Sequence, residues 1–210
     1  MKIAVVGATG RTGSQVVEQG LARGHYVTAL ARNPDPASAR HPNLVTVRAD
    51  VLDRESIGRA LHGAEAVVSA LGIGTSRTST VVYSEGIANI LTAMRASSIR
   101  RVAAISAAPV GPRAEQPFIE RRLAMPILDR IFGATYADMR RMEKRLADSD
   151  VDWISLRPPR LVEKPGTGGY RLGLAPLPKA RSLTYTDLAA ALLDSLDRED
   201  LYHRAAFVAN

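Results

Sequence analysis

Residues 5–15, with the sequence VVGATGRTGSQ, follow an apolar run that begins at Ile3, and they carry glycines at positions 7, 10 and 13. An apolar run that leads directly into closely spaced glycines is typical of a buried β-strand that turns sharply into an α-helix. The helix start then presents unpaired N–H groups and the positive end of its dipole to an anion. The segment therefore predicts a dinucleotide-binding loop, with a bare structural turn between strand and helix as the alternative.

Each glycine of this loop has an expected role. We expect Gly7 at a positive φ, Gly10 where a pyrophosphate approaches the backbone, and Gly13 where the helix packs closely on the sheet. Three further side chains of the loop offer hydroxyl or guanidinium donors to phosphate oxygens, namely Thr9, Arg11 and Thr12.

Strand-like apolar runs alternate with helical patterns along the rest of the chain, which is typical of a parallel sheet covered by helices on both faces. We therefore expect an α/β fold, a Rossmann-type, doubly wound, mostly parallel sheet, in one domain that spans residues 1–210. The expected strands are residues 2–6, 25–31, 44–48, 66–71, 102–106, 151–156 and 205–208, with one more short strand in the segment GTGGYRLG, residues 166–173. The expected helices are residues 12–23, 54–61, 80–96, 136–146 and 186–196, the last of them capped by Thr184 or Thr186.

Residues 107–135 break this rhythm, because four prolines interrupt them and residues 118–132 look like an irregular helical excursion. The segment also carries Phe118, Phe132 and several arginines. It is either a lid over an anionic planar substrate or a helical insertion that extends the core.

Composition excludes several classes of protein. The chain has no cysteine, so disulfides, thiolate metal sites and cysteine nucleophiles are excluded. Its apolar runs are shorter than the ~20 residues that a membrane helix needs. A strand pattern that begins at Lys2 leaves no room for a signal peptide. We therefore expect a cytoplasmic protein without a membrane partner. The net charge of +7 could indicate binding of nucleic acid. However, the segment 100–145, which carries many of the basic residues, has few aromatic residues and no nucleic-acid-binding motif. An anionic small molecule such as a nucleotide or flavin phosphate is favoured instead.

The residue after the second expected strand distinguishes NAD from NADP. A site for NAD usually has an acidic residue there, whereas this chain has Arg32 in the segment ALARNP. An arginine favours the 2′-phosphate of NADP, and a solvated arginine at a strand end is the alternative. Asp50, after the third strand, either accepts the adenine amino group or caps the turn before Arg54. The glycines of SALGIG, residues 69–74, permit close passage of the cofactor.

Six segments together resemble the atypical short-chain dehydrogenase/reductase group of NAD(P)H-binding proteins, and within it the biliverdin IXβ reductase/flavin reductase family. They are KIAVVGATGRTG (2–13), ARNP (31–34), ADVLD (49–53), SALG (69–72), SEGIANILTAMR (84–95) and DWISLRPPRL (152–161). The resemblance implies that Arg32 holds the 2′-phosphate of NADP(H), while Gly7, Thr9, Gly10, Arg11 and Thr12 hold the pyrophosphate. It also implies that Asp50 and Val51 border the adenine, Leu71 and Gly72 the ribose, and Ser106, Ala107, Arg160 and Leu161 the nicotinamide.

Catalytic groups are scarce. The Tyr-x-x-x-Lys pair of short-chain dehydrogenases is missing, and the nearest spacing, Tyr136 to Arg140, ends in an arginine that cannot relay protons. Tyr136 is therefore interpreted as a packing or pocket-lining residue rather than a general acid. Arg160 stands where flavin reductase relatives carry a histidine, which argues against a proton donor there. Ser106 is the candidate catalytic residue, able to bond the nicotinamide carboxamide or a substrate carbonyl. Glu143 either is a solvated helix residue, which is the favoured interpretation, or faces the cleft. The four histidines, to which no function is assigned, are His25, His41, His62 and His203.

These observations favour an NADPH-dependent oxidoreductase that delivers hydride to a flavin or a similar conjugated planar acceptor, with solvent supplying the proton. Catalysis then rests on holding two planar rings in register. A non-catalytic NADP(H)-sensing regulatory protein of the NmrA-like kind is the main alternative, and a relative of sugar-nucleotide epimerases and dehydratases is the third. We expect FMN or another flavin as substrate rather than as a resident group, and either a monomer or a homodimer.

Overall fold

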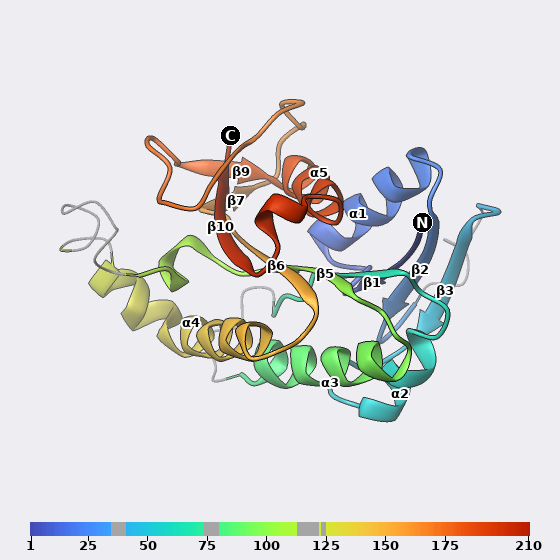
Figure 1. Cartoon of the computed structure of the whole chain (residues 1–210). Helices are drawn as coiled ribbons and strands as arrows, with labels where there is room; N and C mark the ends of the chain where they lie inside the picture. Colours follow the sequence, from blue (N-terminus) through green and yellow to red (C-terminus); the bar gives the residue numbers. More distant parts are fainter. Residues whose placement is uncertain (35–40, 74–79, 113–121, 123–124) are drawn as a thin grey trace.

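A computed structural model of the chain describes residues 1–34, 41–73, 80–112, 122 and 125–210 (Figure 1). Its main sheet has eight strands in the order β3-β2-β1-β4-β5-β6-β10-β8. All neighbouring strands are parallel except β8, which is antiparallel to β10. These strands are β1 (Lys2–Val6), β2 (Tyr26–Ala31), β3 (Leu44–Arg48), β4 (Ala66–Ser69), β5 (Arg101–Ile105), β6 (Asp152–Arg157), β8 (Arg171–Gly173) and β10 (Arg204–Ala209).

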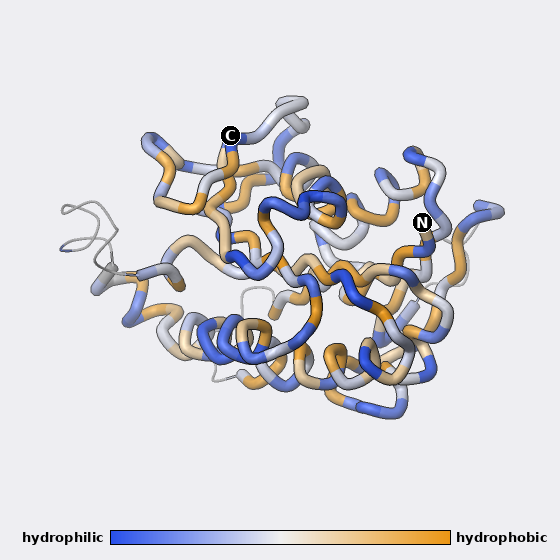
Figure 2. Tube along the Cα trace, viewed as in Figure 1, coloured by the Kyte–Doolittle hydropathy of each residue, from blue (hydrophilic) through white to orange (hydrophobic). Residues whose placement is uncertain are grey.

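Helices lie on both faces of this sheet, so the expected doubly wound, mostly parallel Rossmann-type fold is confirmed (Figure 1). Figure 2 shows hydrophilic and hydrophobic residues alternating along the helices of the lower layer, as amphipathic helices require. The helices are α1 (Arg11–Ala22), α2 (Arg54–Ala60), α3 (Val82–Ala96), α4 (Met125–Ala147) and α5 (Tyr185–Ser195), with short 3₁₀ turns η2 (Ala108–Val110) and η5 (Glu199–Leu201).

Two apolar clusters, one on each face of the sheet, form the core. Successive side chains of a strand point to opposite faces, so Ala4 and Val6 of β1 join one cluster while Ile3 and Val5 join the other. One cluster contains the buried residues of α2, α3 and α4, and the other those of α1 and α5. This double burial explains why the central strands read as continuous apolar runs.

Helix α4 begins at Met125, so the expected start at Tyr136 is wrong. Pro126 lies in the first turn of the helix, where its missing N–H removes no intrahelical hydrogen bond, and it therefore does not interrupt the helix. The segment from Met125 to Thr135 is thus the first part of α4. Phe118 and its neighbours lie outside the described residues, and the choice between lid and insertion stays a prediction.

The C-terminal third contains a small second sheet that the sequence pattern did not indicate. Strands β7 (Arg160–Val162) and β9 (Ser182–Thr184) pair in parallel. The expected short strand in residues 166–173 is confirmed as β8, and the Thr184 hydroxyl caps α5 by accepting from the Asp187 N–H. Across the described residues, no helix has both the length and the apolar character needed to cross a membrane.

Candidate functional site

Gly7, in the turn after β1, lies in close contact with the residue after β4 and with the end of β2. Gly7 has φ +82°, as expected, and a Cβ atom placed on it would lie 2.7 Å from the carbonyl oxygen of Ala70. The N–H groups of Gly7 and Ala8 both donate to the Leu30 carbonyl at 3.1 Å, which fixes the turn against the end of β2. A side chain at Gly7 would therefore be strained both by its backbone angle and by contact with the residue after β4.

Gly10 and Gly13 set how closely α1 approaches this turn. A Cβ atom on Gly13 would lie 2.1 Å from the Gly7 carbonyl oxygen. The sequence predicts that Gly13 allows close packing of the helix on the sheet, but the close contact is between α1 and the loop itself. Gly10 is exposed, its N–H donates to the Gly7 carbonyl at 3.0 Å, and it is the N-cap of α1 without a side-chain cap. The helix start is thus open to solvent, with the first-turn N–H groups not bonded by a capping side chain.

The polar side chains of the loop lie in different surroundings. Thr9 is exposed, whereas Thr12 is buried. Arg11 is also exposed, and its Nη1 donates to the Tyr185 hydroxyl at 3.0 Å while its guanidinium carbon lies 5.6 Å from the centre of that ring. The hydrogen bond to Tyr185 raises the pKa of Arg11, so the guanidinium stays charged beside the open helix start.

A hollow of about 450 Å³ lies at the carboxyl ends of β2 and β3. Arg32 follows β2, and Arg48 ends β3, where the sheet register pairs it with Ala31. Neither guanidinium has an ion-pair or hydrogen-bond partner within the described part of the chain. Sequence reasoning missed Arg48, because only the sheet register shows that the end of β3 lies beside the end of β2. The hollow is lined by Arg32, Asn33, Arg48, Ala49, Asp50, Asp53 and Ser56.

The two carboxylates in this hollow are occupied by backbone N–H groups. Asp50 Oδ1 accepts from the Leu52 N–H at 3.0 Å, so the expected turn-capping role of Asp50 is confirmed, and its adenine role stays a prediction. The cap of α2 itself is Asp53, whose Oδ1 accepts from the N–H groups of Glu55 and Ser56. Both carboxylates therefore have hydrogen-bond donors within the chain, whereas the two guanidinium groups have no acceptor in its described part.

Next to the hollow, Val51 and Leu71 pack over Gly86 of α3. A Cβ atom on Gly86 would lie 3.0 Å from Leu71 Cδ1 and from Val51 Cγ2. Asn89 of α3 also donates from Nδ2 to the Val51 carbonyl at 2.9 Å. Gly86 and Asn89 of the SEGIANILTAMR segment thus position the two apolar residues predicted to border the adenosine. Gly72 is exposed with open space around its Cα atom, and Gly74 lies outside the described residues.

Ser106 lies directly after β5, and its hydroxyl is buried without a hydrogen-bond partner in the described part of the chain. The residue is 2% exposed. Its N–H donates to the Leu156 carbonyl at 2.8 Å, and the Ala108 N–H donates to the Pro158 carbonyl at 2.8 Å, so two hydrogen bonds join the ends of β5 and β6. A buried hydroxyl without a partner loses free energy, which marks a group that a bound molecule can satisfy.

Arg160 and Leu161 lie in β7, the short strand that follows β6 in the chain. Arg160 pairs in register with Ser182 and is exposed, while Leu161 pairs with Leu183 and is half-buried. Ala107 packs against the core cluster of α3 and α4. The predicted nicotinamide-side residues therefore follow two adjacent strands, β5 and β6, at the same edge of the sheet as the glycine loop.

Tyr136 and Arg140 do not form a proton-transfer pair. Arg140 Nη2 donates to the Pro109 carbonyl at 3.1 Å, and the Tyr136 ring lies 6.1 Å from that of Phe132. Burial raises the pKa of the Tyr136 phenol, which opposes its ionisation. Tyr136 is partly buried against the core cluster, which agrees with a packing role, and its pocket-lining role stays a prediction.

The expectation that Glu143 is a solvated helix residue is wrong. Arg157 binds it through two hydrogen bonds, Nε to Oε1 at 3.0 Å and Nη2 to Oε2 at 2.6 Å, and the Ser155 hydroxyl donates to Oε1 at 3.0 Å. The side chains of Glu143 and Arg157 are 11% and 12% exposed. Alternate residues of β6 point toward α4, so Ser155 and Arg157 both reach this carboxylate.

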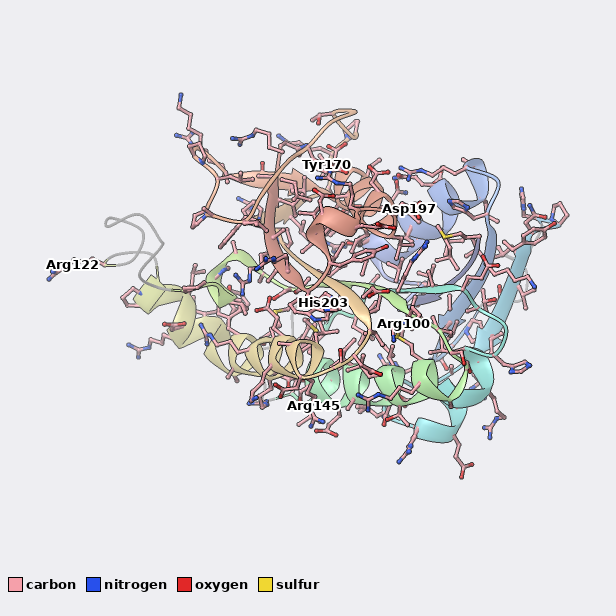
Figure 3. The ribbon with its side chains drawn as sticks, in the orientation of Figure 1. Arg100, Arg122, Arg145, Tyr170, Asp197 and His203 are labelled. Atoms are coloured by element: carbon pink, nitrogen blue, oxygen red, sulfur yellow. The ribbon has the colours of Figure 1, made fainter. Side chains whose placement is uncertain are left out.

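His203 and several surface arginines lie apart from these groups. His203 and Arg100 lie near Asp152 at the amino end of β6, the opposite edge of the sheet from the glycine loop (Figure 3). Arg145 and Arg101 bind Glu85 and Asp197, so these two basic residues of the 100–145 region are paired (Figure 3). Within the described ranges, no group of three metal-binding side chains occurs.

The strand order, the glycine loop after β1 and the hollow beyond β2 and β3 define the class of nucleotide-binding Rossmann proteins. The chain belongs to an NAD(P)H-binding family, whose model matches residues 7–199.

Comparisons with known proteins agree with this assignment. The chain is similar to a 3-diazoavenalumate denitrifying reductase from a Streptomyces species, with 35% identity over 194 residues that make up 82% of this chain and 60% of that protein. It therefore spans about three fifths of the length of this relative. A short-chain dehydrogenase/reductase from Veillonella parvula in complex with NADP has a TM-score of 0.79 at 18% identity, covering 100% of this chain and 94% of the other. A "putative NADH-flavin reductase" from Streptococcus pneumoniae has a TM-score of 0.76 at 20% identity, covering 100% and 99%. At these identities both structures show the fold.

Proposed function

We propose that the protein is an NADPH-dependent reductase that delivers hydride to a flavin or a similar conjugated planar acceptor. The observation that carries the proposal is the pair of unpaired guanidinium groups, Arg32 and Arg48, that line one hollow beyond β2 and β3. A monoester phosphate carries close to two negative charges near pH 7 and accepts several hydrogen bonds, so two converging arginines suit the 2′-phosphate of NADPH. A bare ribose hydroxyl gives them little to bind.

The remaining predicted contacts suit the rest of the cofactor. The open start of α1, with Thr9 and Arg11, takes the pyrophosphate, and a side chain at Gly10 would enter this space. Val51, Leu71 and Gly72 then border the adenine and ribose. The unpartnered Ser106 hydroxyl can bond the nicotinamide carboxamide, and Arg160 and Leu161 close the other side of that ring.

When bound, NADPH supplies a hydride, which carries two electrons to the acceptor, while a solvent proton completes the reduction. The residues of the chain bind and orient the two rings, because the sequence lacks the Tyr-x-x-x-Lys pair that would transfer the proton. Catalysis by proximity and orientation alone can supply a large part of the rate enhancement when both rings are held in contact. The reductase names of similar proteins support the reaction type, and the pneumococcal structure supports a flavin acceptor.

The test is NADPH oxidation followed at 340 nm with FMN, riboflavin, quinones and biliverdin as acceptors. We expect turnover with at least one flavin, and a preference for NADPH over NADH. Arg32→Asp should reverse this preference. Its matched control is Arg59→Ala, which removes an exposed arginine of α2 that lies 3.6 Å from Glu55 and should leave the cofactor preference unchanged. Tight NADPH binding without turnover for every acceptor would contradict the reductase proposal and favour a sensing role.

A further inference from the structure

Two buried side-chain polar atoms lack a hydrogen-bond partner in the described part of the chain, Ser106 Oγ and Thr135 Oγ1. Thr135 is 7% exposed and lies on α4, so it is not part of the strand-end contacts described above. A threonine inside a helix can normally donate to a carbonyl of the preceding turn, as Thr92 of α3 does to Ala88. Within the described residues Thr135 makes no such bond, so its hydroxyl lacks a hydrogen-bond partner that a bound molecule could provide.

The contacts of α4 place Thr135 at the ligand edge of the sheet. Glu143 binds the end of β6, and Arg140, one turn earlier, binds Pro109 just after β5. Asp138, earlier still, accepts from the N–H of Tyr83 at the start of α3. The turns of α4 before Asp138 therefore extend past the start of α3, as Figure 1 shows, beyond the carboxyl ends of the strands.

Thr135 shares one face of α4 with two aromatic rings. Phe132, Thr135 and Tyr136 have the spacing i, i+3, i+4, which brings their side chains together on a helix. The two rings are half-buried, their centroids are 6.1 Å apart and their planes are tilted by 50°. Stacking surface and a hydrogen-bond donor are thus combined on this face.

The charged groups near this face are already engaged. Asp138 is fully buried and accepts from Tyr83, Ser84 and Arg141. Arg140 donates to Pro109. The face therefore presents aromatic surface and the hydroxyls of Thr135 and Tyr136, and burial together with the nearby carboxylate of Asp129 raises the pKa of Tyr136. This combination suits an uncharged flat ring with a carbonyl edge better than an anion.

We propose that Phe132, Thr135 and Tyr136 form the wall that binds the acceptor ring, an isoalloxazine, and that Thr135 Oγ1 donates to one of its carbonyl oxygens. This inference rests on the proposed reductase function, and it assigns the acceptor side of the same site. Thr135 is covered in this structure, so binding requires that the side chains over it move. The bound ring then provides the partner that the hydroxyl lacks.

Thr135→Val tests the assignment, because valine keeps the shape and removes the hydroxyl. Riboflavin is the probe, and its fluorescence quenching by the NADP⁺-loaded protein gives a Kd. We expect Thr135→Val to raise this Kd about 5- to 10-fold, the value of one hydrogen bond, with the Kd of NADPH unchanged. The melting temperature should stay the same or rise, because the variant removes a buried polar group without a partner. Thr92→Val is the control, and we expect it to lower the melting temperature and leave the riboflavin Kd unchanged.

Each outcome decides between the two proposals. An unchanged riboflavin Kd in Thr135→Val, a melting temperature that falls as in Thr92→Val, or no riboflavin binding by the wild type would overturn the assignment of this wall. Riboflavin binding that depends on Thr135 without any NADPH oxidation would overturn the reductase function and keep the wall. Turnover with an unchanged KM for riboflavin in Thr135→Val would keep the function and overturn the wall.

Discussion

Gly13→Ala is the substitution for which helix propensity and tertiary geometry predict opposite results. Gly13 lies in the first turn of α1, and alanine is preferred over glycine in helices by about 1 kcal/mol. The new methyl carbon would, however, lie 2.1 Å from the Gly7 carbonyl oxygen. Both sides of this contact are backbone, so α1 or the loop has to move by about 1 Å before an ordinary contact distance is reached.

The size of the effect follows from this displacement. Overpacking of a rigid interior costs about 1–3 kcal/mol, and a contact between two backbone segments belongs at the upper end. In a protein of this length, 3 kcal/mol lowers the melting temperature by roughly 6–12 °C. Because the displaced atoms form the proposed pyrophosphate contact, the Kd of NADPH should also rise by roughly tenfold or more.

Differential scanning calorimetry and NADPH fluorescence titration measure the two effects. Gly58→Ala is the matched control, because Gly58 lies in α2 and nothing lies within 4 Å of its added methyl. We expect it to stabilise the protein by about 0.5–1 kcal/mol and to leave NADPH binding unchanged. A Gly13→Ala protein as stable as the wild type would show that the glycine loop yields easily, and would refute the reasoning.

Three further outcomes test the site and its support. Arg32→Asp should reverse the preference for NADPH over NADH in paired titrations. Arg48→Ala should weaken NADPH binding about tenfold and leave NADH binding unchanged. Equal losses of affinity for both cofactors would contradict a 2′-phosphate site. Glu143→Ala leaves Arg157 nearly buried without a counter-charge and should lower the free energy of unfolding by about 3–5 kcal/mol, with partial recovery in Glu143→Gln, both measured by urea denaturation. Burial opposes ionisation of Asp187, but hydrogen bonds from Thr167, Thr184 and Asn210 outweigh it and lower the pKa below 3.8. Its contribution to stability is therefore present above pH 3.8 and lost as the pH falls through the lower folded value, so melting curves of Asp187→Asn should lose this part of the acid slope.

The part of the fold set by local patterns was predictable. The apolar run into the glycine loop, the alternation of strands and helices, and Arg32 after β2 are all visible within short windows of sequence. Pro126 misled the reading of α4, because proline ends a helix in its interior but is tolerated in its first turn. The pairing of β7 with β9 joins short segments that are distant in sequence, so no local pattern indicated it.

The parts of the site that depend on tertiary register were not predictable. Arg48 became a candidate only when the sheet placed it beside Ala31, next to Arg32. Glu143 looked like any helix glutamate until β6 brought Arg157 and Ser155 against it. The missing partner of Thr135 is likewise a property of packing, since a threonine at that position usually bonds its own helix.

The two unpaired arginines of the hollow also determine how the free protein responds to its buffer. Arg32 and Arg48 line one hollow without an acceptor from the described part of the chain, and a small dianion that enters the hollow can accept hydrogen bonds from both. Inorganic phosphate and sulfate should therefore stabilise the free protein and compete with NADPH. In phosphate buffer the apparent Kd of NADPH then includes competition with the buffer anion at the same site. The Kd of the cofactor itself is the one measured in a buffer of monovalent salts.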